Sequence, residues 1–321
     1  MLKDIPGGIY PTMITPYTTD NKIDYNAVEQ LLAWYAERGV DGIFAICQSS
    51  EIFFLSFEER LELLKFIMAH KPANTAIVAS GHVADDLDRQ IYEAKAFADT
   101  GIDAYVFISN RFASPDESDD VLLKNMERAA DALPEVSLGV YECPHPYKRL
   151  LTPYVLQKMA QTGKYQFLKD TCCDIKTIER RVQAVKDTPL VIYNANTATL
   201  LDSLRLGLEG YSGIMANFHA DLWAWLCENY ADPAQADRVE QMMNFLGAAS
   251  MVERQIYPVN CKYHMNLLGV PMTLVTRTRN PLELTAGKVT AATADEYPSS
   301  AILEIDQYFA CEQMFRKAFF G

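Results

Sequence analysis

The feature that most constrains the fold is a regular alternation between short apolar runs and segments whose apolar residues have helical spacing. Eight apolar runs occur before about residue 230, at 8–14, 42–46, 76–79, 104–108, 136–141, 165–168, 189–193 and 212–215. Runs of this length, bounded by turn residues, are typical of buried strands. Because a helix must carry the chain back before the next parallel strand, the alternation predicts a parallel sheet covered by helices.

Capping residues stand at the expected starts of several helices. Asp24 precedes a segment with helical spacing, and Ser56 with Glu59 forms a capping box. Thr152 is followed by Pro153, the order of an N-cap and a first helical residue. These signals predict helices that begin near residues 25, 57 and 153.

Eight strand–helix units in this length favour a closed (β/α)8 TIM barrel over an open, doubly wound α/β sheet. No Gly-x-Gly-x-x-Gly turn follows the first run, which argues against a dinucleotide-binding fold. After residue 232 the alternation stops and the pattern becomes mostly helical. We therefore predict a catalytic barrel over residues 1–232 and a C-terminal helical region, 233–321, packed on it.

Composition excludes several classes of function. The net charge of −13 argues against nucleic acid or an anionic membrane surface as a partner. No apolar run approaches the roughly 20 residues that span a bilayer, and the first residues lack the apolar core of a signal peptide. The seven cysteines include no CxxC and the five histidines no HExxH. We expect a cytoplasmic protein with reduced thiols and no metal or organic cofactor.

Lys169 is the first candidate for chemistry, because it ends the apolar run 165–168. Active sites of barrel enzymes lie at the carboxyl ends of the strands. Burial there lowers the pKa of a lysine from about 10.4 and makes its amine nucleophilic. Taken alone, the segment also fits a solvated Lys-Asp turn, but its place in the repeat favours the buried nucleophile. Unusual residues also end the second, fifth and seventh runs, at 47–51, 141–144 and 193–196.

These segments occur in a recognisable order. The run Cys47-Gln48-Ser49-Ser50-Glu51 is followed by Tyr141 with Pro144 and then by Leu168-Lys169-Asp170-Thr171. In this order and spacing the chain resembles the dihydrodipicolinate synthase / N-acetylneuraminate lyase family of pyruvate-dependent class I aldolases. Further segments similar to the family are Gly8 to Pro16, Gly213 to Asn217, Lys262, Leu268-Gly269 and Pro281-Leu282.

The resemblance implies a role for each candidate. Lys169 would form an imine with a 2-oxo acid, and Tyr141 would act as general acid and base. The backbone N–H groups and hydroxyls of small residues would bind the substrate carboxylate. The expected substrate-binding residues are Gln48, Ser49, Ser50, Thr171, Ile214 and Met215, the last two as apolar walls. The resemblance also implies a homo-oligomer, a dimer or a tetramer.

Three departures from the family pattern bear on the substrate. Gln48 replaces a hydroxyl residue that relays protons in many members, and an amide cannot relay them. The segment 108–112 has no tyrosine to match the one that a neighbouring subunit contributes. Pro146 stands where dihydrodipicolinate synthases place an arginine for a second carboxylate, and Arg149 lies three residues further on.

We therefore predict a carbon–carbon lyase that makes or breaks a bond between pyruvate and an aldehyde. The favoured substrate is a 2-keto-3-deoxy sugar acid or a related hydroxylated 2-oxo acid. One alternative is 4-hydroxy-tetrahydrodipicolinate synthesis, and another is a hydratase-aldolase on an aromatic aldehyde, which Phe53 and Phe54 would suit. An alternative of another class is a non-catalytic homologue that only binds 2-oxo acids.

Overall fold

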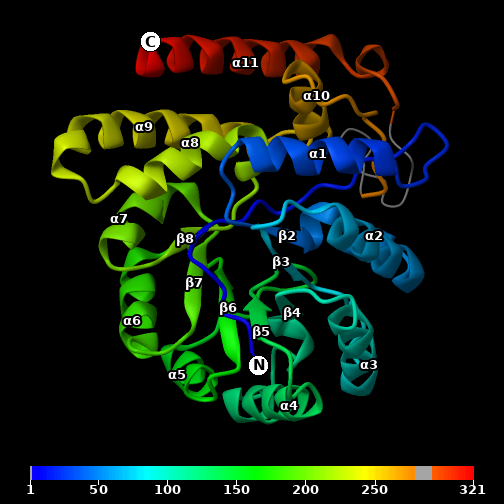
Figure 1. The fold of residues 1–321 in the computed structure, drawn as a ribbon, viewed down its shortest axis with the longest axis vertical. Helices are drawn as coiled ribbons and strands as arrows, with labels where there is room; N and C mark the ends of the chain where they lie inside the picture. Colours follow the sequence, from blue (N-terminus) through cyan, green and yellow to red (C-terminus); the bar gives the residue numbers. More distant parts are fainter. Residues whose placement is uncertain (1, 279–290) are drawn as a thin grey trace.

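The computed structural model describes residues 2–278 and 291–321. Eight parallel strands form a barrel in the order β1-β8-β7-β6-β5-β4-β3-β2 (Figure 1). The strands are β1 (Gly8–Ile9), β2 (Gly42–Ile46), β3 (Ala76–Ala79), β4 (Ala104–Ile108), β5 (Leu138–Tyr141), β6 (Tyr165–Asp170), β7 (Val191–Asn194) and β8 (Gly210–Tyr211). The predicted (β/α)8 barrel is confirmed.

The seam between β1 and β2 is joined just beyond the end of β1. Thr12 forms an isolated parallel bridge with Phe44. The Phe44 N–H donates to the Pro11 carbonyl at 3.0 Å, and the Met13 N–H donates to the Phe44 carbonyl at 3.0 Å. This short ladder brings the barrel close to full closure.

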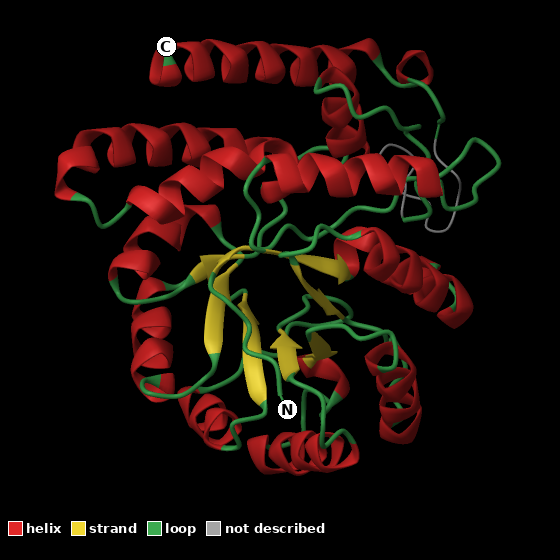
Figure 2. Cartoon of the chain, viewed as in Figure 1, coloured by secondary structure: helices red, strands yellow, loops and turns green. Residues whose placement is uncertain are grey.

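Helices surround the strands and continue beyond them (Figure 2). The helices are α1 (Tyr25–Glu37), α2 (Phe57–His70), α3 (Leu87–Ala98), α4 (Asp119–Ala132), α5 (Pro153–Gln161), α6 (Ile175–Val185), α7 (Leu200–Arg205), α8 (Ala216–Asn229), α9 (Ala236–Ala249), α10 (Val259–Leu267) and α11 (Ser299–Phe320). The predicted starts are confirmed, because Asp24 and Thr152 cap α1 and α5 and Ser56 forms its capping box with Glu59.

Two predicted strands differ from the structure. The first strand is only Gly8–Ile9, and the last is Gly210–Tyr211 rather than 212–215. Residues 212–215 lead instead into α8, with Met215 at its N-cap. A short apolar run does not distinguish a strand from the entry to a buried helix. The pairing of Gly8 with Gly210 decides the register here, because a Cβ at position 210 would lie 2.4 Å from the Gly8 carbonyl.

Aromatic rings fill the barrel interior. Tyr10 and Tyr193 lie with ring centroids 4.7 Å apart, and Phe167 stacks on Tyr193 at 4.5 Å. Phe44 meets Phe167 edge-on at 5.8 Å. Each of these side chains is fully buried. The interior is therefore a packed core beneath the carboxyl ends of the strands, as in other barrels of this type.

Glycines on the inward face make room for these rings. A Cβ at Gly42 would lie 2.1 Å from the Tyr10 ring, and one at Gly139 would lie 2.9 Å from the Phe167 side chain. Real side chains do not tolerate such approaches. Because these two glycines have no side chain, the neighbouring aromatic rings occupy that space, and the interior keeps a normal packing density.

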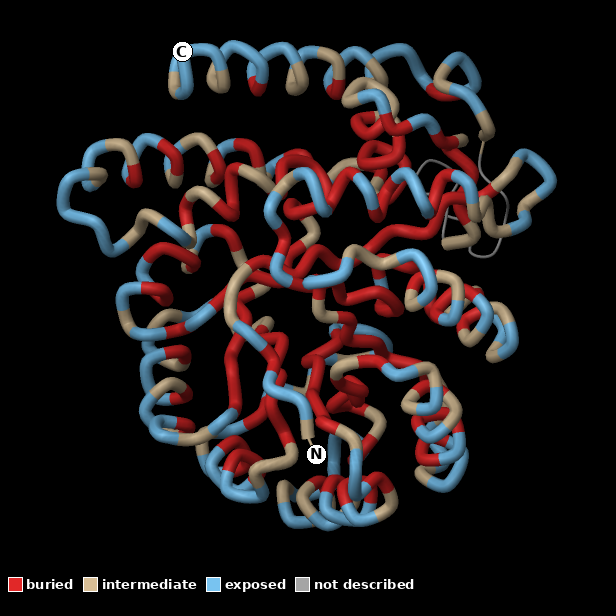
Figure 3. Tube along the Cα trace, viewed as in Figure 1, coloured by how far each residue is buried: buried red, intermediate tan, exposed pale blue. Residues whose placement is uncertain are grey.

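The C-terminal helices stack beyond α1 and α8, with α11 outermost (Figure 1). Figure 3 shows α11 exposed along most of its length, and Ile305 and Glu312 are its buried residues. Glu312 pairs with His264 of α10 at 2.7 Å, and Phe315 stacks on Phe245 of α9 at 4.0 Å. The division into residues 1–232 and 233–321 stays a prediction.

None of the helices in the described part of the chain is long and apolar enough to cross a membrane. Pro281-Leu282, one of the segments that resembled the family, lies outside the described residues.

Removing one ring from the interior is expected to destabilise the fold. Phe167→Ala leaves a cavity at the centre of the barrel, so the free energy of unfolding should fall by about 3–5 kcal/mol. Urea denaturation followed by circular dichroism measures this change. Leu303→Ala on α11 is the control, since that side chain is 54% exposed and should change stability by less than about 0.5 kcal/mol. Similar effects of the two substitutions would contradict the packed interior.

Candidate active site

A cavity of about 380 Å³ opens at the carboxyl ends of the strands. Its lining comes from the ends of β5 and β6, from the segments after β2, β5, β6, β7 and β8, from residues 253–258 and from Thr278. The lining includes Gln48, Ser49, Tyr141, Lys148, Lys169, Thr171, Asn196, Ile214, Glu253 and Tyr257. The position agrees with the general placement of active sites in barrels.

Lys169 lies near the end of β6 and is 5% exposed. It is in register with Tyr141 of β5 and Tyr193 of β7, and it shares the inward face with Phe167, two residues earlier. Its Nζ lies 4.5 Å from the centroid of the Tyr141 ring and 5.8 Å from that of Phe44. The amine thus sits on top of the aromatic interior.

Burial lowers the pKa of Lys169, and Cys47, Cys143 and Glu253 oppose this shift only in part. No carboxylate of the described residues forms an ion pair with its Nζ. Desolvation without a partner favours the neutral amine. A neutral amine is the form that attacks a carbonyl carbon.

Tyr141 directs its hydroxyl toward Gln48. The phenol donates a hydrogen bond to Gln48 Oε1 at 3.1 Å, and Cys143 Sγ lies 3.6 Å from the same oxygen. Burial raises the pKa of Tyr141 well above its usual range. The phenol is therefore protonated at neutral pH. Gln48 orients the phenol by accepting its hydrogen bond, but the amide cannot relay the proton.

The two serines of the β2 loop take different positions. Ser49 lines the cavity, and its hydroxyl donates to Thr12 Oγ1 at 3.1 Å. The Ser50 hydroxyl instead lies 2.6 Å from the Met13 carbonyl and 2.9 Å from the Ala45 carbonyl. It also accepts from the Cys47 N–H at 3.1 Å. Ser50 therefore closes the loop from behind, whereas Ser49 faces the cavity.

The other predicted substrate-binding residues also divide into those that line the cavity and one that does not. Thr171 lines the cavity and donates through Oγ1 to the Glu142 carbonyl at 2.8 Å. Ile214 also lines the cavity, whereas Met215 is fully buried in the hydrophobic core. The structure thus brings together Lys169, Tyr141, Gln48, Ser49, Thr171 and Ile214 around one space, and leaves Ser50 and Met215 outside it.

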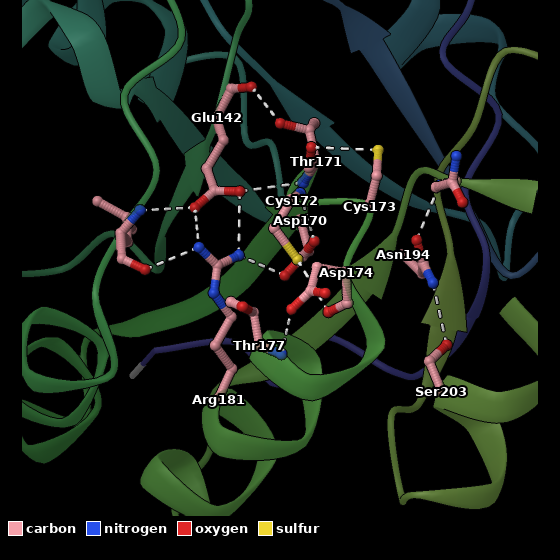
Figure 4. A network of polar contacts seen from close by, with 12 residues as sticks. Glu142, Asp170, Thr171, Cys172, Cys173, Asp174, Thr177, Arg181, Asn194 and Ser203 are labelled. Carbon is pink, nitrogen blue, oxygen red and sulfur yellow. Dashed lines mark hydrogen bonds and ion pairs between the residues drawn. The ribbon is translucent and has the colours of Figure 1, made fainter. Parts of the chain in front are cut away.

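A buried charged network behind the site escaped the sequence analysis (Figure 4). Arg181 of α6 reaches Glu142 Oε1 at 2.7 Å and Glu142 Oε2 at 3.1 Å, and it pairs with Asp170. It also donates to the Leu151 carbonyl at 2.7 Å. All three charged side chains are at most 1% exposed. Because a buried charge without its partner is costly, the network holds the ends of β5 and β6 together.

A signal for this network was present in the sequence. Glu142 and Asp170 each follow a candidate residue, Tyr141 or Lys169, directly. Successive side chains of a strand point to opposite faces. The two carboxylates must therefore turn outward from the barrel, where a helix has to supply a cation.

The β2 loop is held by a second buried carboxylate. Glu51 has a φ of 64°, and its Oε1 lies 3.4 Å from Lys262 Nζ. Its Oε2 accepts from Thr276 Oγ1 at 2.7 Å and from the Thr278 N–H at 2.7 Å. These bonds tie the loop that carries Ser49 to α10 and to the segment after it.

Segment 253–258 supplies three lining residues, Glu253, Tyr257 and Pro258, and none of them was a predicted site residue. Glu253 is half-buried, and burial raises the pKa of its carboxyl, with Arg254 and Lys169 acting in the opposite sense. It has no hydrogen-bond or ion-pair partner among residues 2–278 and 291–321. Tyr257 stands beside it in the lining. Neither position belongs to a motif, so the sequence carried no signal for them.

Fixed cations for a second substrate carboxylate are scarce in the described lining. Arg149 points elsewhere, donating to the Ser114 carbonyl at 2.7 Å and the Glu117 carbonyl at 2.9 Å. Lys148 lines the cavity, but it is exposed and donates to the Thr171 carbonyl at 2.8 Å. The described residues also contain no group of three or more His, Cys, Asp or Glu arranged to hold a metal ion.

Comparisons with known proteins agree with the geometry. Residues 5–294 match the family model described as the dihydrodipicolinate synthetase family. The chain is 25% identical to 4-hydroxy-tetrahydrodipicolinate synthase of Pseudoalteromonas atlantica, over 81% of this chain and 88% of that protein. It is 26% identical to N-acetylneuraminate lyase of Rhizobium meliloti, over 82% of this chain and 86% of that protein.

Solved structures share the fold. YagE, a prophage protein of the dihydrodipicolinic acid synthase family from E. coli K12 in complex with pyruvate, superposes with a TM-score of 0.81 at 19% identity, covering 97% of this chain and 98% of that one. Dihydrodipicolinate synthase of Cyanidioschyzon merolae with lysine bound gives 0.79 at 20% identity, covering 96% and 99%. The chain therefore belongs to the dihydrodipicolinate synthetase family, and with it to the carbon–carbon lyases of the class I aldolase type.

Proposed function

We propose that this chain is a Schiff-base aldolase that cleaves or forms a bond between pyruvate and an aldehyde, with Lys169 as the imine-forming residue. The observation that carries the proposal is the buried, unpaired amine at the floor of the cavity, in register with Tyr141. The named relatives support the same class of chemistry.

The proposed reaction begins with attack of the neutral Lys169 amine on C2 of the 2-oxo acid. Loss of water gives an iminium, which accepts the electron pair of the C3–C4 bond when that bond breaks. The C4 hydroxyl loses its proton, and the fragment that begins at C4 leaves as an aldehyde. The resulting enamine is protonated at C3, and hydrolysis releases pyruvate and the free amine.

Tyr141 is the proposed proton carrier of this sequence. Its phenol adjoins the amine, so it can protonate the departing water during imine formation. The same group can accept the proton of the C4 hydroxyl. Gln48 holds the phenol through its amide oxygen at 3.1 Å. Proton exchange with solvent must then pass through the substrate or the open side of the cavity.

The cavity favours a hydroxylated, uncharged acceptor, consistent with a 2-keto-3-deoxy sugar acid as substrate. Glu253 offers acceptor oxygens for hydroxyl groups, and Asn196 adds an amide. A carboxylate on the acceptor would meet Glu253, and Lys148 is the one lining cation besides Lys169 in the described part of the chain. Arg149 is committed to the segment 114–119.

The alternatives receive less support from the geometry. Dihydrodipicolinate synthesis would require a cation for the second carboxylate. An aromatic acceptor would require Phe53 or Phe54 at the cavity. Phe53 instead packs edge-on against His145 at 4.7 Å, and neither phenylalanine belongs to the lining.

We further propose a homo-oligomer, a dimer or a tetramer, working in the cytoplasm. The oligomer is what the family resemblance implies. All seven cysteines are free thiols, as a reducing compartment maintains them.

Reductive trapping tests the lysine. Incubation with pyruvate and borohydride should add one reduced pyruvyl group to the wild type, and Lys169→Ala should remain unmodified. The trapping rate should rise with pH until the amine is deprotonated, at a pKa below the usual lysine value, because burial lowers the pKa of Lys169. Intact-mass measurement gives both the amount of adduct and the trapping rate. Lys148→Ala is the control and should retain the adduct, and an equal adduct on Lys169→Ala would refute the assignment.

Tyr141→Phe tests the proton carrier. Loss of the phenolic hydroxyl should leave imine formation possible but slow it by on the order of 10²-fold. Stopped-flow measurement of imine formation gives the rate. A rate near that of the wild type would remove Tyr141 from the mechanism.

Glu253→Gln tests the preference for the acceptor. Removing the carboxylate should lower kcat/KM for a hydroxylated aldehyde such as glyceraldehyde by about 10-fold, because hydrogen bonds to charged groups contribute about 1.5–3 kcal/mol. Activity with a carboxylate-bearing aldehyde should rise relative to the activity with glyceraldehyde. Glu228→Gln, an exposed position of α8, is the control. An unchanged ratio between the two aldehydes would exclude Glu253 from acceptor selection.

A further inference from the structure

The hydrogen-bond ladder between β5 and β6 weakens at the point where the two proposed reacting side chains stand. Tyr141 and Lys169 are in register at the ends of these strands. One residue further on, the Glu142 N–H lies 3.4 Å from the Lys169 carbonyl. This distance is longer than that of an ordinary N–H···O bond. The backbone ladder alone therefore does not fix the separation of the two strand ends.

Side chains on the outer face of the strands supply the missing connection. Glu142 Oε2 accepts from the Thr171 N–H at 3.0 Å, and Thr171 Oγ1 donates to the Glu142 carbonyl at 2.8 Å. The residue after Tyr141 is thus bound to a residue two positions after Lys169. Glu142 Oε1 also accepts from the Leu151 N–H at 2.7 Å, which connects the end of β5 to the segment before α5.

Arg181 joins both strand ends to one guanidinium group. Its Nη2 donates to Glu142 Oε1 at 2.7 Å and its Nη1 to Glu142 Oε2 at 3.1 Å, and it also pairs with Asp170 (Figure 4). Asp170 follows Lys169 directly, as Glu142 follows Tyr141. A guanidinium is planar and its donors are fixed relative to one another, so a bidentate contact sets both distance and angle. The position of each strand end therefore depends on the same rigid group.

We propose that Arg181 is a positioning residue, which holds the phenol of Tyr141 against the amine of Lys169. It acts through the carboxylates that follow these two residues, and it does not belong to the described lining of the cavity. The assignment rests on the proposed function, because it concerns imine formation at Lys169. The Tyr141 ring centroid lies 4.5 Å from Lys169 Nζ. A displacement of about 1 Å between reacting groups can lower a rate by about 10²-fold.

The test is Arg181→Lys, which keeps the positive charge but removes the bidentate contact. Imine formation with saturating pyruvate, followed by stopped-flow, should slow by about 10-fold to 100-fold. The rates are compared on the high-pH plateau, where Lys169 is neutral in both proteins, so that a change in its pKa does not contribute. The final borohydride adduct should still reach one per chain, because a folded variant keeps the amine.

A double variant shows whether Arg181 acts through the phenol. Effects of residues in one network are not additive, so Arg181→Lys has little left to disturb once the Tyr141 hydroxyl is removed. The plateau rate of Arg181→Lys combined with Tyr141→Phe should lie within about 3-fold of that of Tyr141→Phe alone. Multiplication of the two separate effects would show that Arg181 does not act through Tyr141.

Arg316 provides a matched control, because it also bridges two carboxylates. It pairs with Glu312 at 2.7 Å and with Asp221 Oδ1 at 3.0 Å. It lies on α11, which contributes no residue to the described lining of the cavity. Arg316→Lys should lower stability but leave the plateau rate unchanged.

Glu142→Gln keeps the inference testable if Arg181→Lys does not fold. The amide retains one oxygen for the guanidinium, and loss of the second acceptor should lower the plateau rate by about 10-fold. An unchanged plateau rate in the folded variant, or an equal loss in Arg316→Lys, would overturn the assignment of Arg181 and leave the proposed function intact. Absence of any adduct on the wild type would instead refute the proposed function, and this inference with it.

Discussion

The stacking of aromatic rings inside the barrel is the interaction on which the rest of the structure depends. Phe167 and Tyr193 fill the space below the cavity, and Lys169 stands on the same inward face two residues after Phe167. Water cannot approach the amine from below, so its charged form is disfavoured. Glycines at 42 and 139 make this filling possible, because a side chain at either position would collide with a ring. The packing of the interior and the lowered pKa of Lys169 therefore have a common origin.

The charges needed to support this site are kept off the inward face. Arg181 binds Glu142 and Asp170 on the outer side of β5 and β6 (Figure 4). Lys262 and the segment before residue 279 hold Glu51 beneath the β2 loop. Each buried charge in these networks has a partner, which limits its desolvation cost. Lys169 has no such partner among the described carboxylates, and this contrast separates the structural lysine from the proposed reactive one.

The parts of the site that the sequence predicted follow from strand geometry. Lys169 and Tyr141 end neighbouring parallel strands, so their side chains had to meet at the carboxyl edge of the barrel. Strand geometry could not predict which residue of the pair Ser49 and Ser50, or of the pair Ile214 and Met215, faces the cavity. Ser50 and Met215 turn away from the cavity because a 3-10 turn and the start of α8 replace strand alternation there. Residue type alone does not report that change of direction.

The sequence by itself determined the barrel, its helix starts and the lysine at its mouth, because these depend on local periodicity, capping and the order of elements along the chain. Only the tertiary structure decided what surrounds that lysine. Glu253 and Tyr257 reach the cavity from a segment that follows the barrel by more than twenty residues, and no local pattern encodes that return. The proposed preference for a hydroxylated acceptor rests mainly on Glu253, because specificity depends on contacts between residues distant in sequence.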